Sequence, residues 1–431
     1  MLNTGRLALF ERVPSNAMTG AQPSRLPNFP KRQASMERAG WQPTILSSRR
    51  GQAHFMRIGL DGYPLVAPKT GVGHYTLELA KALAKLSPEH SFELIAPKPF
   101  PPEVVAEIET QPNMRSIEVK TNSITGRWWS VGLPLYVRRA SLDIFHGTNY
   151  EVPLWNRERN IVTVHDLSVF THADKHEDTV AGRAQRRLPI MLRAATRIIT
   201  PTDAVKREVT DRFRIDSSRI AVTPEAPRES FQPMHFENTA AVRQRFGIEN
   251  DFILFVGTIE PRKNLLALVR AFDSVLRETR HRPQLVIAGG AGWLTDELDR
   301  FVAAANFGNR LRMTGYLNDD DLRALYSSCK LFVYPSVYEG FGLPPLEAMA
   351  CGAPVIASRI PALEETLKDN ARLVDPLDER QLAKAIIELL EGNTERETLA
   401  KKGHAHAATF SWEQTAKLTL EIYEDVWRGS H

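Results

Sequence analysis

Short apolar runs alternate with longer segments in which apolar residues recur every three or four positions, from residue 56 to the end of the chain. The short runs predict strands buried on both faces, and the helical spacing predicts amphipathic helices. Predicted strands fall at 57–60, 92–96, 144–145, 161–164, 198–200 and 220–222, and again at 252–258, 283–290, 311–316, 330–336, 354–358 and 371–375. Predicted helices fall at 73–85, 186–195, 203–213, 264–278, 320–328, 346–351, 379–390 and 411–426. This alternation predicts an α/β protein with parallel sheets and right-handed crossovers.

The two series of strands predict two doubly wound domains, joined within the proline-rich stretch 223–234. We place the N-terminal domain at 56–232 and the C-terminal domain at 233–410. Residues 411–431 form a last helix, which we expect to pack back on the N-terminal domain. Ligands of such sheets bind at the carboxyl ends of the strands, and with two domains this means the cleft between them.

The basic character of the chain comes from its first residues. The whole chain of 431 residues has a net charge of +4, and residues 1–55 alone carry +6, so residues 56–431 carry −2. The folded part therefore gives no reason to expect nucleic acid as a partner. Only Cys329 and Cys351 occur, which excludes a disulfide framework and suits a reducing compartment.

The segment 1–55 is rich in Pro, Ser and Arg and has no periodicity, which predicts a disordered basic tail. A transit peptide is one interpretation, because such peptides are rich in Arg and poor in acids. An upstream extension of the reading frame, or a plain tail, is the interpretation we favour, because Met56 begins a regular strand.

The segment YEGFGLPPLEAMACGAPVIAS, residues 338–358, indicates a ligand. Gly340 and Gly342 stand just before a helix start, where free N–H groups and the helix dipole favour an anion. Glu339 and Glu347 would repel that anion, so we expect them to meet hydroxyl groups instead. A phosphate together with several hydroxyls describes a nucleotide sugar. The alternative is a capped helix with two solvated acids.

The order of motifs resembles a known family. Four motifs follow one another along the chain: a glycine loop ending in TGVGHYT, a His-Asp pair after a strand, FVGTIEPRKNL at 255–265, and the segment 338–358. Over residues 56–428 the chain resembles the retaining glycosyltransferases of family 4, and GLDG with VTVHDLSVF resembles the mannosyltransferases among them. The resemblance implies the GT-B fold, two Rossmann-like domains with the active site in the interdomain cleft. The C-terminal domain would bind the nucleotide sugar and the N-terminal domain the acceptor.

The resemblance also implies roles for residues. It makes Glu339, His165, Arg262 and Lys263 catalytic, with Arg262 and Lys263 on the phosphates and Asp166 orienting His165. Arg262 and Lys263 would also offset the charges of Glu339 and Glu347. The other donor-binding positions are Gly71, Gly73, Gly257, Tyr316, Leu317, Phe341, Gly342, Leu343 and Glu347, with Glu347 on the ribose. Asn264 is expected to cap the helix after Lys263.

The resemblance implies transfer of a hexose, with GDP-mannose as the donor substrate and with retention of configuration. No cofactor is expected. Asp319 to Asp321 could hold a metal ion, but acids at a helix start usually cap it, so we predict a metal-independent enzyme. The acceptor would be a glycan or a lipid-linked glycan, in polysaccharide or lipopolysaccharide-type biosynthesis. An epimerase on the same fold and a non-catalytic nucleotide-sugar-binding protein are the alternatives.

No apolar run approaches the roughly 20 residues that span a bilayer. We therefore predict a cytoplasmic protein, with peripheral contact to the inner face of the membrane as a further interpretation. Trp128, Trp129 and the following VRRA combine aromatic and basic residues in a way that suits such contact. An ordinary core edge explains the same residues equally well.

Overall fold

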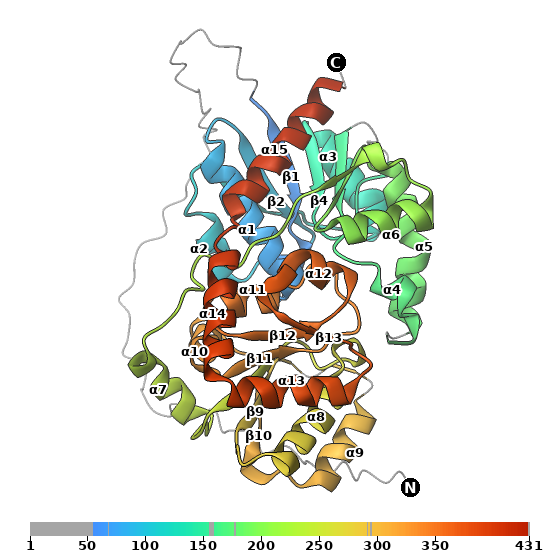
Figure 1. Ribbon diagram of the computed structural model, residues 1–431. Helices are drawn as coiled ribbons and strands as arrows, with labels where there is room; N and C mark the ends of the chain where they lie inside the picture. Colours follow the sequence, from blue (N-terminus) through green and yellow to red (C-terminus); the bar gives the residue numbers. More distant parts are fainter. Residues whose placement is uncertain are drawn as a thin grey trace, which may run out of the picture. The chain divides into compact units, whose positions relative to one another are not determined.

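The computed structural model describes residues 55–67, 69–154, 159–175, 178–290, 292–293 and 295–429. The predicted tail, apart from Phe55, lies outside these residues. Within them the chain forms two fully parallel sheets, as the alternation of strands and helices predicted (Figure 1). The described part from Phe55 onward is one compact unit.

The first sheet has the strand order β3-β2-β1-β4-β5-β6-β7. Its strands are β1 Arg57–Asp61, β2 Ser91–Ala96, β3 Met114–Glu118, β4 Ile144–Gly147, β5 Asn160–Thr163, β6 Arg197–Thr200 and β7 Ile220–Val222. Its helices are α1 Gly71–Leu86, α2 Pro102–Ile108, α3 Leu133–Ala140, α4 Ser168–Thr171, α5 Asp178–Ala194 and α6 Asp203–Phe213. The order reverses between β1 and β4, which places a switch point beside the carboxyl end of β1.

The second sheet has the order β10-β9-β8-β11-β12-β13. Its strands are β8 Phe252–Val256, β9 Gln284–Ala288, β10 Leu311–Gly315, β11 Leu331–Tyr334, β12 Val355–Ser358 and β13 Arg372–Val374. Its helices are α7 Phe236–Arg245, α8 Leu265–Glu278, α9 Asp296–Ala305, α10 Asp319–Ser328, α11 Leu343–Ala350, α12 Pro361–Leu367, α13 Glu379–Glu391 and α14 Asn393–Ala407. Its switch point lies between β8 and β11, and both strands lead into segments singled out in the sequence.

The strands are buried because apolar residues occupy both of their faces. In β8, Phe252, Ile253, Leu254 and Phe255 are fully buried, and in β12 Val355, Ile356 and Ala357 are fully buried. Helices cover the sheet, with α8 packed against α13 and α11 against α14. One large apolar cluster forms the core around the second sheet, and smaller clusters form the core around the first.

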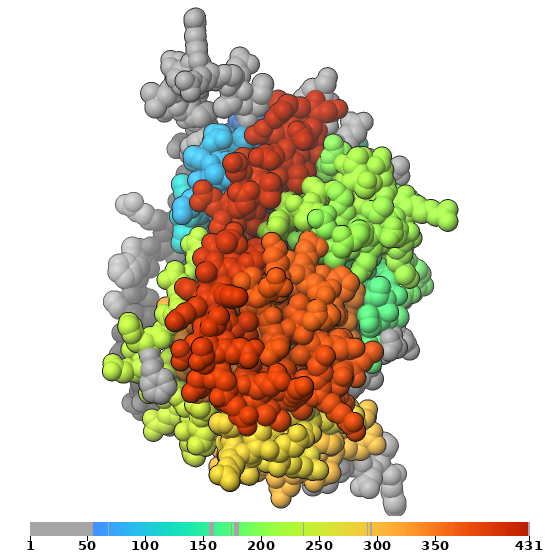
Figure 2. All heavy atoms as spheres, in the orientation of Figure 1, coloured from blue at the N-terminus to red at the C-terminus, as the bar shows by residue number. Residues whose placement is uncertain are grey.

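The last helix, α15 Trp412–Gly429, lies against α1 rather than against the second sheet (Figures 1 and 2). Its buried residues Trp412, Ala416, Tyr423 and Val426 belong to the apolar cluster of β1 and α1. The hydroxyl of Tyr423 lies 2.7 Å from Nδ1 of the buried His146 in β4. The chain therefore returns to its first sheet after completing the second.

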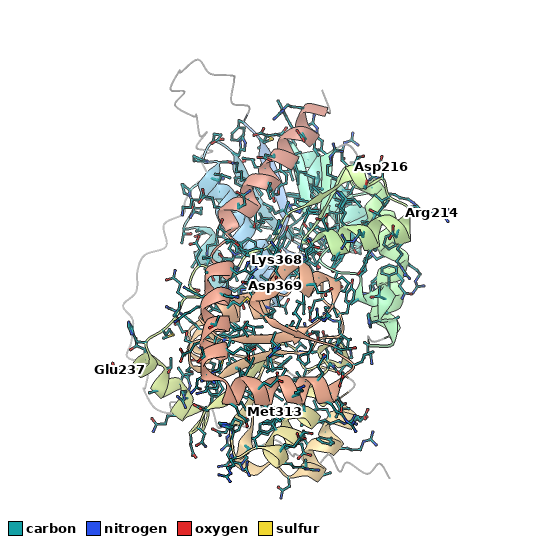
Figure 3. The ribbon with its side chains drawn as sticks, in the orientation of Figure 1. Arg214, Asp216, Glu237, Met313, Lys368 and Asp369 are labelled. Atoms are coloured by element: carbon teal, nitrogen blue, oxygen red, sulfur yellow. The ribbon has the colours of Figure 1, made fainter. Side chains whose placement is uncertain are left out.

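The predicted helices have the right positions but several wrong ends. The helix predicted from Arg186 begins at Asp178, and the sequence pattern missed α2, α3, α4, α7, α9, α12 and α14. Asn264 does not cap α8 with its side chain, because its φ of 56° turns the side chain toward the carbonyls of Pro335 and Pro376. Residues with positive φ also follow other helices: Arg214 after α6 has a φ of 51° and Lys368 after α12 has a φ of 50°. Figure 3 labels both residues.

Candidate active site

The loop between β11 and α11 carries the segment that first indicated a ligand. Gly342 precedes the helix with a φ of 99°, and a Cβ there would lie 2.4 Å from the Leu363 side chain. A Cβ on Gly340 would lie 1.7 Å from the carbonyl oxygen of His165, which belongs to the first sheet's half of the chain. Both glycines are therefore required by close approach, and the loop is pressed against the end of β5. Phe341 is buried and Leu343 is half-buried.

Glu339 lies between the two predicted phosphate ligands. Its Oε1 accepts a hydrogen bond of 2.6 Å from Lys263 Nζ, and its Oε2 accepts one of 3.1 Å from Arg262 Nη1. Burial alone would raise the pKa of Glu339, but the two cations outweigh it and lower the pKa to about 2. Glu339 is therefore a carboxylate at neutral pH, and the structure brings these three predicted residues together.

The two basic residues have other acidic and polar neighbours and some donors to spare. Arg262 Nη2 donates to Glu260 at 2.6 Å, and Lys263 Nζ donates to the Tyr334 hydroxyl at 2.7 Å. Burial and the charge of Arg262 lower the pKa of Lys263, against the pull of Glu339. The buried Nε of Arg262 finds no acceptor among the described residues. An unsatisfied buried donor is costly.

Gly257 supports the loop that carries these cations. Its N–H donates to the Ala288 carbonyl at the end of β9, and a Cβ on the neighbouring Gly289 would lie 1.9 Å from the Gly257 oxygen. The φ of Gly257 is 154°. The loops after β8 and β9 thus pack backbone against backbone. This contact fixes the position of the loop that leads to Arg262 and Lys263.

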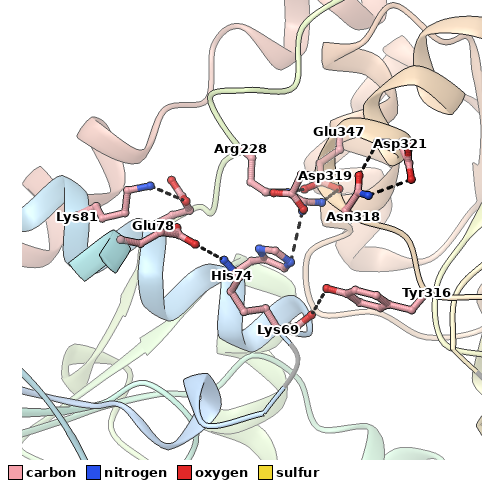
Figure 4. A network of polar contacts seen from close by, with 11 residues as sticks. Lys69, His74, Glu78, Lys81, Arg228, Tyr316, Asn318, Asp319, Asp321 and Glu347 are labelled. Atoms are coloured by element: carbon pink, nitrogen blue, oxygen red, sulfur yellow. Dashed lines mark hydrogen bonds and ion pairs between the residues drawn. The ribbon is translucent and has the colours of Figure 1, made fainter. Parts of the chain in front are cut away.

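Glu347 is paired with an arginine that the sequence did not single out. Arg228 holds both oxygens of Glu347, with Nε–Oε1 at 2.8 Å and Nη2–Oε2 at 3.0 Å (Figure 4). Arg228 Nη1 also donates to Asp319 at 2.6 Å and to His74 Nε2 at 3.4 Å. The expectation that Arg262 and Lys263 offset Glu347 is therefore wrong, because Arg228 does so and those two residues bind Glu339.

His165 lies at the end of β5, held on both ring nitrogens. Nδ1 lies 3.0 Å from Glu225 Oε1, and Nε2 lies 2.8 Å from the Thr148 carbonyl oxygen. Both neighbours are acceptors, so the ring carries two protons. Burial opposes this charge, but the hydrogen bonds and the charge of Glu225 outweigh it, and the pKa of His165 is raised.

The expected role of Asp166 is wrong in this structure. Its carboxylate accepts from the backbone and hydroxyl of Ser168, at 2.9 and 2.7 Å, rather than from His165. Glu225 and the Thr148 carbonyl orient His165 instead.

The glycine loop before α1 contacts the segment after β10 of the second sheet. Gly71 begins α1 with open space at its Cβ position, whereas Gly73 is buried with the Pro64 oxygen 3.0 Å from that position. Tyr316, after β10, is 60% exposed and its hydroxyl donates to the Lys69 carbonyl at 3.3 Å (Figure 4). Leu317 beside it is buried. The glycine loop and Tyr316, both predicted to bind the donor, are therefore in contact.

Two of the three acids at the start of α10 have basic partners among the described residues. Asp319 pairs with Arg228, Asp321 pairs with Arg245, and the side chain of Asn318 caps the helix by accepting from the Asp321 N–H. The cap is therefore Asn318 rather than an aspartate. No cluster of three or more His, Cys, Asp or Glu side chains suited to a metal ion occurs among the described residues.

Of the two tryptophans considered for membrane contact, Trp128 and Trp129, the first is buried. Trp128 is buried, and its ring packs edge-on against Trp129, which in turn packs against Tyr63. Trp128 therefore belongs to the core, while Ile124 nearby is 68% exposed. Within the described residues no helix is both long and apolar enough to cross a membrane.

Several residues that build this site gave no signal in the sequence. Glu225 and Arg228 lie in the proline-rich stretch that we used only as a domain boundary. Tyr338 donates to Glu208 at 2.5 Å and accepts from the Leu167 N–H at 2.9 Å, which joins the two halves. Each contact spans more than 50 residues, so no local motif contains both partners.

Comparisons with known proteins agree with this picture. A family model described as Glycosyltransferase Family 4 matches residues 69–226, and one described as Glycosyl transferases group 1 matches residues 239–406. The O-antigen chain mannosyltransferase B of Escherichia coli is 31% identical over 392 residues, which cover 86% of this chain and 100% of that protein. The serotype-specific mannosyltransferase WbdA of Escherichia coli is 34% identical over 55% of this chain and 29% of its own length.

Solved structures show the same architecture. Anabaena HepE in complex with UDP-glucose matches with a TM-score of 0.70 at 17% identity, over 86% of this chain and all of that one. Sucrose-phosphate synthase from Thermosynechococcus elongatus matches with a TM-score of 0.69 at 23% identity, over 87% of this chain and all of that one. At these identities the likeness concerns the fold alone, and it confirms the predicted arrangement of two Rossmann-like domains.

Proposed function

Because the chain belongs to family 4 of the glycosyltransferases, with a mannosyltransferase-like sequence and the GT-B fold, we propose that it transfers mannose from GDP-mannose. The acceptor is a glycan or a lipid-linked glycan, in polysaccharide or lipopolysaccharide-type biosynthesis. One observation carries the proposal: 31% identity over the full length of an O-antigen chain mannosyltransferase.

The arrangement of charges supports a site for a diphosphate and a sugar. In the proposal, Arg262 and Lys263 stabilise the diphosphate as it leaves, together with the backbone N–H groups of Phe341, Gly342 and Leu343. Fixed cations and dipoles that face developing charge are a large source of rate enhancement. No cofactor and no metal ion take part.

The two glutamates divide the hydroxyl groups between them. Glu339 accepts from hydroxyls of the transferred sugar, because it is ionised and lies beside the phosphate-binding cations. Glu347 accepts from the ribose, and Tyr316 and Leu317 lie beside the base. Gly71 and Gly73 bring the start of α1 to the diphosphate and the acceptor.

In this proposal His165 does not form a hydrogen bond to a hydroxyl of the sugar. Its two ring nitrogens already donate to Glu225 and Thr148, so the ring offers no free donor to a sugar hydroxyl. We propose that His165 supplies a fixed positive charge beside Gly340. Its carbonyl oxygen meets that glycine and thereby sets the position of the donor loop.

Configuration is retained in this proposal. The cations that hold Glu339 weaken it as a nucleophile. In the front-face route that the family implies, the acceptor oxygen attacks the anomeric carbon from the side that the diphosphate leaves. The leaving phosphate oxygen then takes the acceptor proton. The anomeric configuration of the product, read by proton NMR, tests this step.

The acceptor side bears on where the protein works. A lipid-linked acceptor would place the enzyme at the inner face of the membrane. Ile124 is exposed, and so are the basic residues Arg127, Arg138 and Arg139 later in the same stretch of the chain; exposed apolar and basic side chains of this kind suit a peripheral contact with anionic lipid.

The donor assay separates this proposal from its alternatives. Purified protein is incubated with GDP-mannose, UDP-glucose, UDP-galactose or UDP-N-acetylglucosamine, and nucleotide release is measured with and without glycan acceptors. We expect release of GDP from GDP-mannose to exceed release from each UDP sugar. A preference for a UDP sugar refutes the mannosyl assignment and leaves the family intact. Conversion of the sugar without release indicates an epimerase, and binding without release or conversion indicates a non-catalytic protein.

A further inference from the structure

We infer that Arg228 is a positioning residue of the donor site, which holds the carboxylate of Glu347 in place for the ribose and ties it to the N-terminal glycine loop. The inference rests on the proposed function, which assigns the ribose to Glu347. Arg228 lies in the segment between β7 and α7 that joins the two sheets, so it lies outside the two C-terminal segments that the sequence singled out, 255–265 and 338–358.

The contacts of Arg228 account for nearly all of its hydrogen-bond donors. A guanidinium has five N–H groups, of which Nε and one on Nη2 form a fork to Glu347. The two on Nη1 face Asp319 and His74. Below the fork, the guanidinium lies 3.9 Å from the centroid of the Phe231 ring. Such a side chain has one orientation, and it imposes that orientation on its partners.

Glu347 needs such a partner because it is buried. Only 5% of Glu347 and 8% of Arg228 are exposed. A buried carboxylate without a counter-ion takes up a proton or turns toward water. Burial raises the pKa of Glu347, and the charge and hydrogen bonds of Arg228 oppose that rise. The fork uses one lone pair on each carboxylate oxygen, and the Tyr326 hydroxyl also acts on this carboxylate. The pair with Arg228 therefore fixes the orientation in which the remaining lone pairs of Glu347 can accept from the hydroxyls of ribose.

Arg228 also reaches across to α1. His74 accepts from Nη1 through its Nε2, which requires a neutral ring with the proton on Nδ1. Burial, followed by the charges of Arg228 and Lys69, lowers the pKa of His74 to about 3, so the ring is neutral at pH 7. His74 lies in the first turn of α1, directly after Gly73, where the glycine loop enters the helix. One guanidinium thus links the ribose-side helices α10 and α11 to the loop on the acceptor side (Figure 4).

The test removes either the arginine or the ribose hydroxyls. Binding of GDP and of 2′,3′-dideoxy-GDP is measured by calorimetry, with UDP and 2′,3′-dideoxy-UDP in parallel. The proteins are the wild type, Arg228→Gln, Arg228→Lys and Glu347→Gln. Arg245→Gln is the matched control, because Arg245 pairs with Asp321 on the same helix start but not with Glu347.

We expect the wild type and the control to bind the ribonucleotide about 10- to 100-fold more tightly than the dideoxy form, as hydrogen bonds to a charged group give. Glu347→Gln and both Arg228 variants should lose most of this ratio, while their affinity for the dideoxy form changes less than about threefold. A defect of folding alone would lower the affinity for both nucleotides equally and leave the ratio intact.

The outcomes separate the inference from its premise. If Glu347→Gln keeps the full ratio, or the wild type shows none, the ribose assignment in the proposed function fails and the inference fails with it. If Glu347→Gln loses the ratio but either folded Arg228 variant keeps it in full, the proposed function stands and the inference is overturned. Arg228→Lys keeps the charge without the fork, so it serves if Arg228→Gln does not fold.

Discussion

Replacing Glu225 with Gln should destabilise the protein at low pH more than at high pH. Glu225 is buried and accepts from His165 Nδ1 at 3.0 Å, and the Thr148 carbonyl accepts from Nε2 at 2.8 Å. The substitution keeps the shape and an acceptor oxygen but removes the negative charge. The remaining ionisable neighbours of the ring are Asp166 beside it in sequence, His146, and the edge-packed Tyr75 and Tyr150.

The magnitude follows from exchanging a charged hydrogen bond for a neutral one. Charged hydrogen bonds contribute about 1.5–3 kcal/mol and neutral ones about 0.5–1.5 kcal/mol, so the variant should lose about 1–2 kcal/mol of unfolding free energy at pH 6. The pKa of His165 is raised in the folded protein. The stability that this shift contributes is fully present at a pH below the pKa of His165 in the unfolded chain, which is near 6.5. It is lost as the pH rises through the pKa of His165 in the folded protein. At pH 9 the difference between variant and wild type should therefore shrink.

The assay is urea unfolding of both proteins at pH 6 and pH 9, followed by tryptophan fluorescence. Glu89→Gln is the control, because Glu89 is exposed and lies 4.0 Å from His90. We expect a small effect for this control at either pH. An equal loss for Glu225→Gln at both pH values would refute the reasoning, because it would mean that Glu225 acts by packing and not by keeping His165 charged.

Three other predictions concern the site and its surroundings. Lys263→Gln should lower kcat by about 10²- to 10³-fold, because one donor to the negative charge that develops on the leaving diphosphate is lost. An unchanged kcat would show that Lys263 does not stabilise this charge. Tyr338→Phe should lower the unfolding free energy by about 1–3 kcal/mol, because the Leu167 N–H and Glu208 each lose a partner; equal thermal melts would contradict this. Transfer should survive EDTA, whereas a loss restored by Mn²⁺ would make Asp319 to Asp321 metal ligands.

The sequence revealed those parts of the fold that depend on local pattern. Continuous apolar runs identify parallel strands, so β8, β9 and β11 were predicted close to their observed ends. β3, with the sequence MRSIE, was missed because it is a polar edge strand, and α14 because its apolar residues do not gather on one face. Local pattern carries no information about such elements, since neighbouring elements decide them.

In the candidate site, too, contacts within or between recognised motifs were predicted, whereas contacts with residues outside these motifs were not. Glu339, Arg262 and Lys263 were expected close together, and they lie within hydrogen-bonding distance. The pairing of Glu347 with Arg228 was not expected, because 119 residues separate them and Arg228 stands in a stretch rich in proline. The partner of His165 was sought next to it in sequence, in Asp166. The true partner, Glu225, is 60 residues away, because the chain crosses β6 and β7 before it returns to the same edge of the sheet.

The position of α15 has a consequence for how the protein is made. Trp412, Ala416 and Tyr423 complete the apolar cluster around α1, so the first half of the chain cannot close its own core. A ribosome adds about 5–20 residues per second, and about 200 residues separate the end of β7 from Tyr423. The apolar face of α1 therefore stays without α15 for about 10–40 seconds while the second half of the chain is synthesised and folds. A nascent chain stopped before α15 should bind chaperones through this face, because the core of the first half closes only when α15 packs against α1.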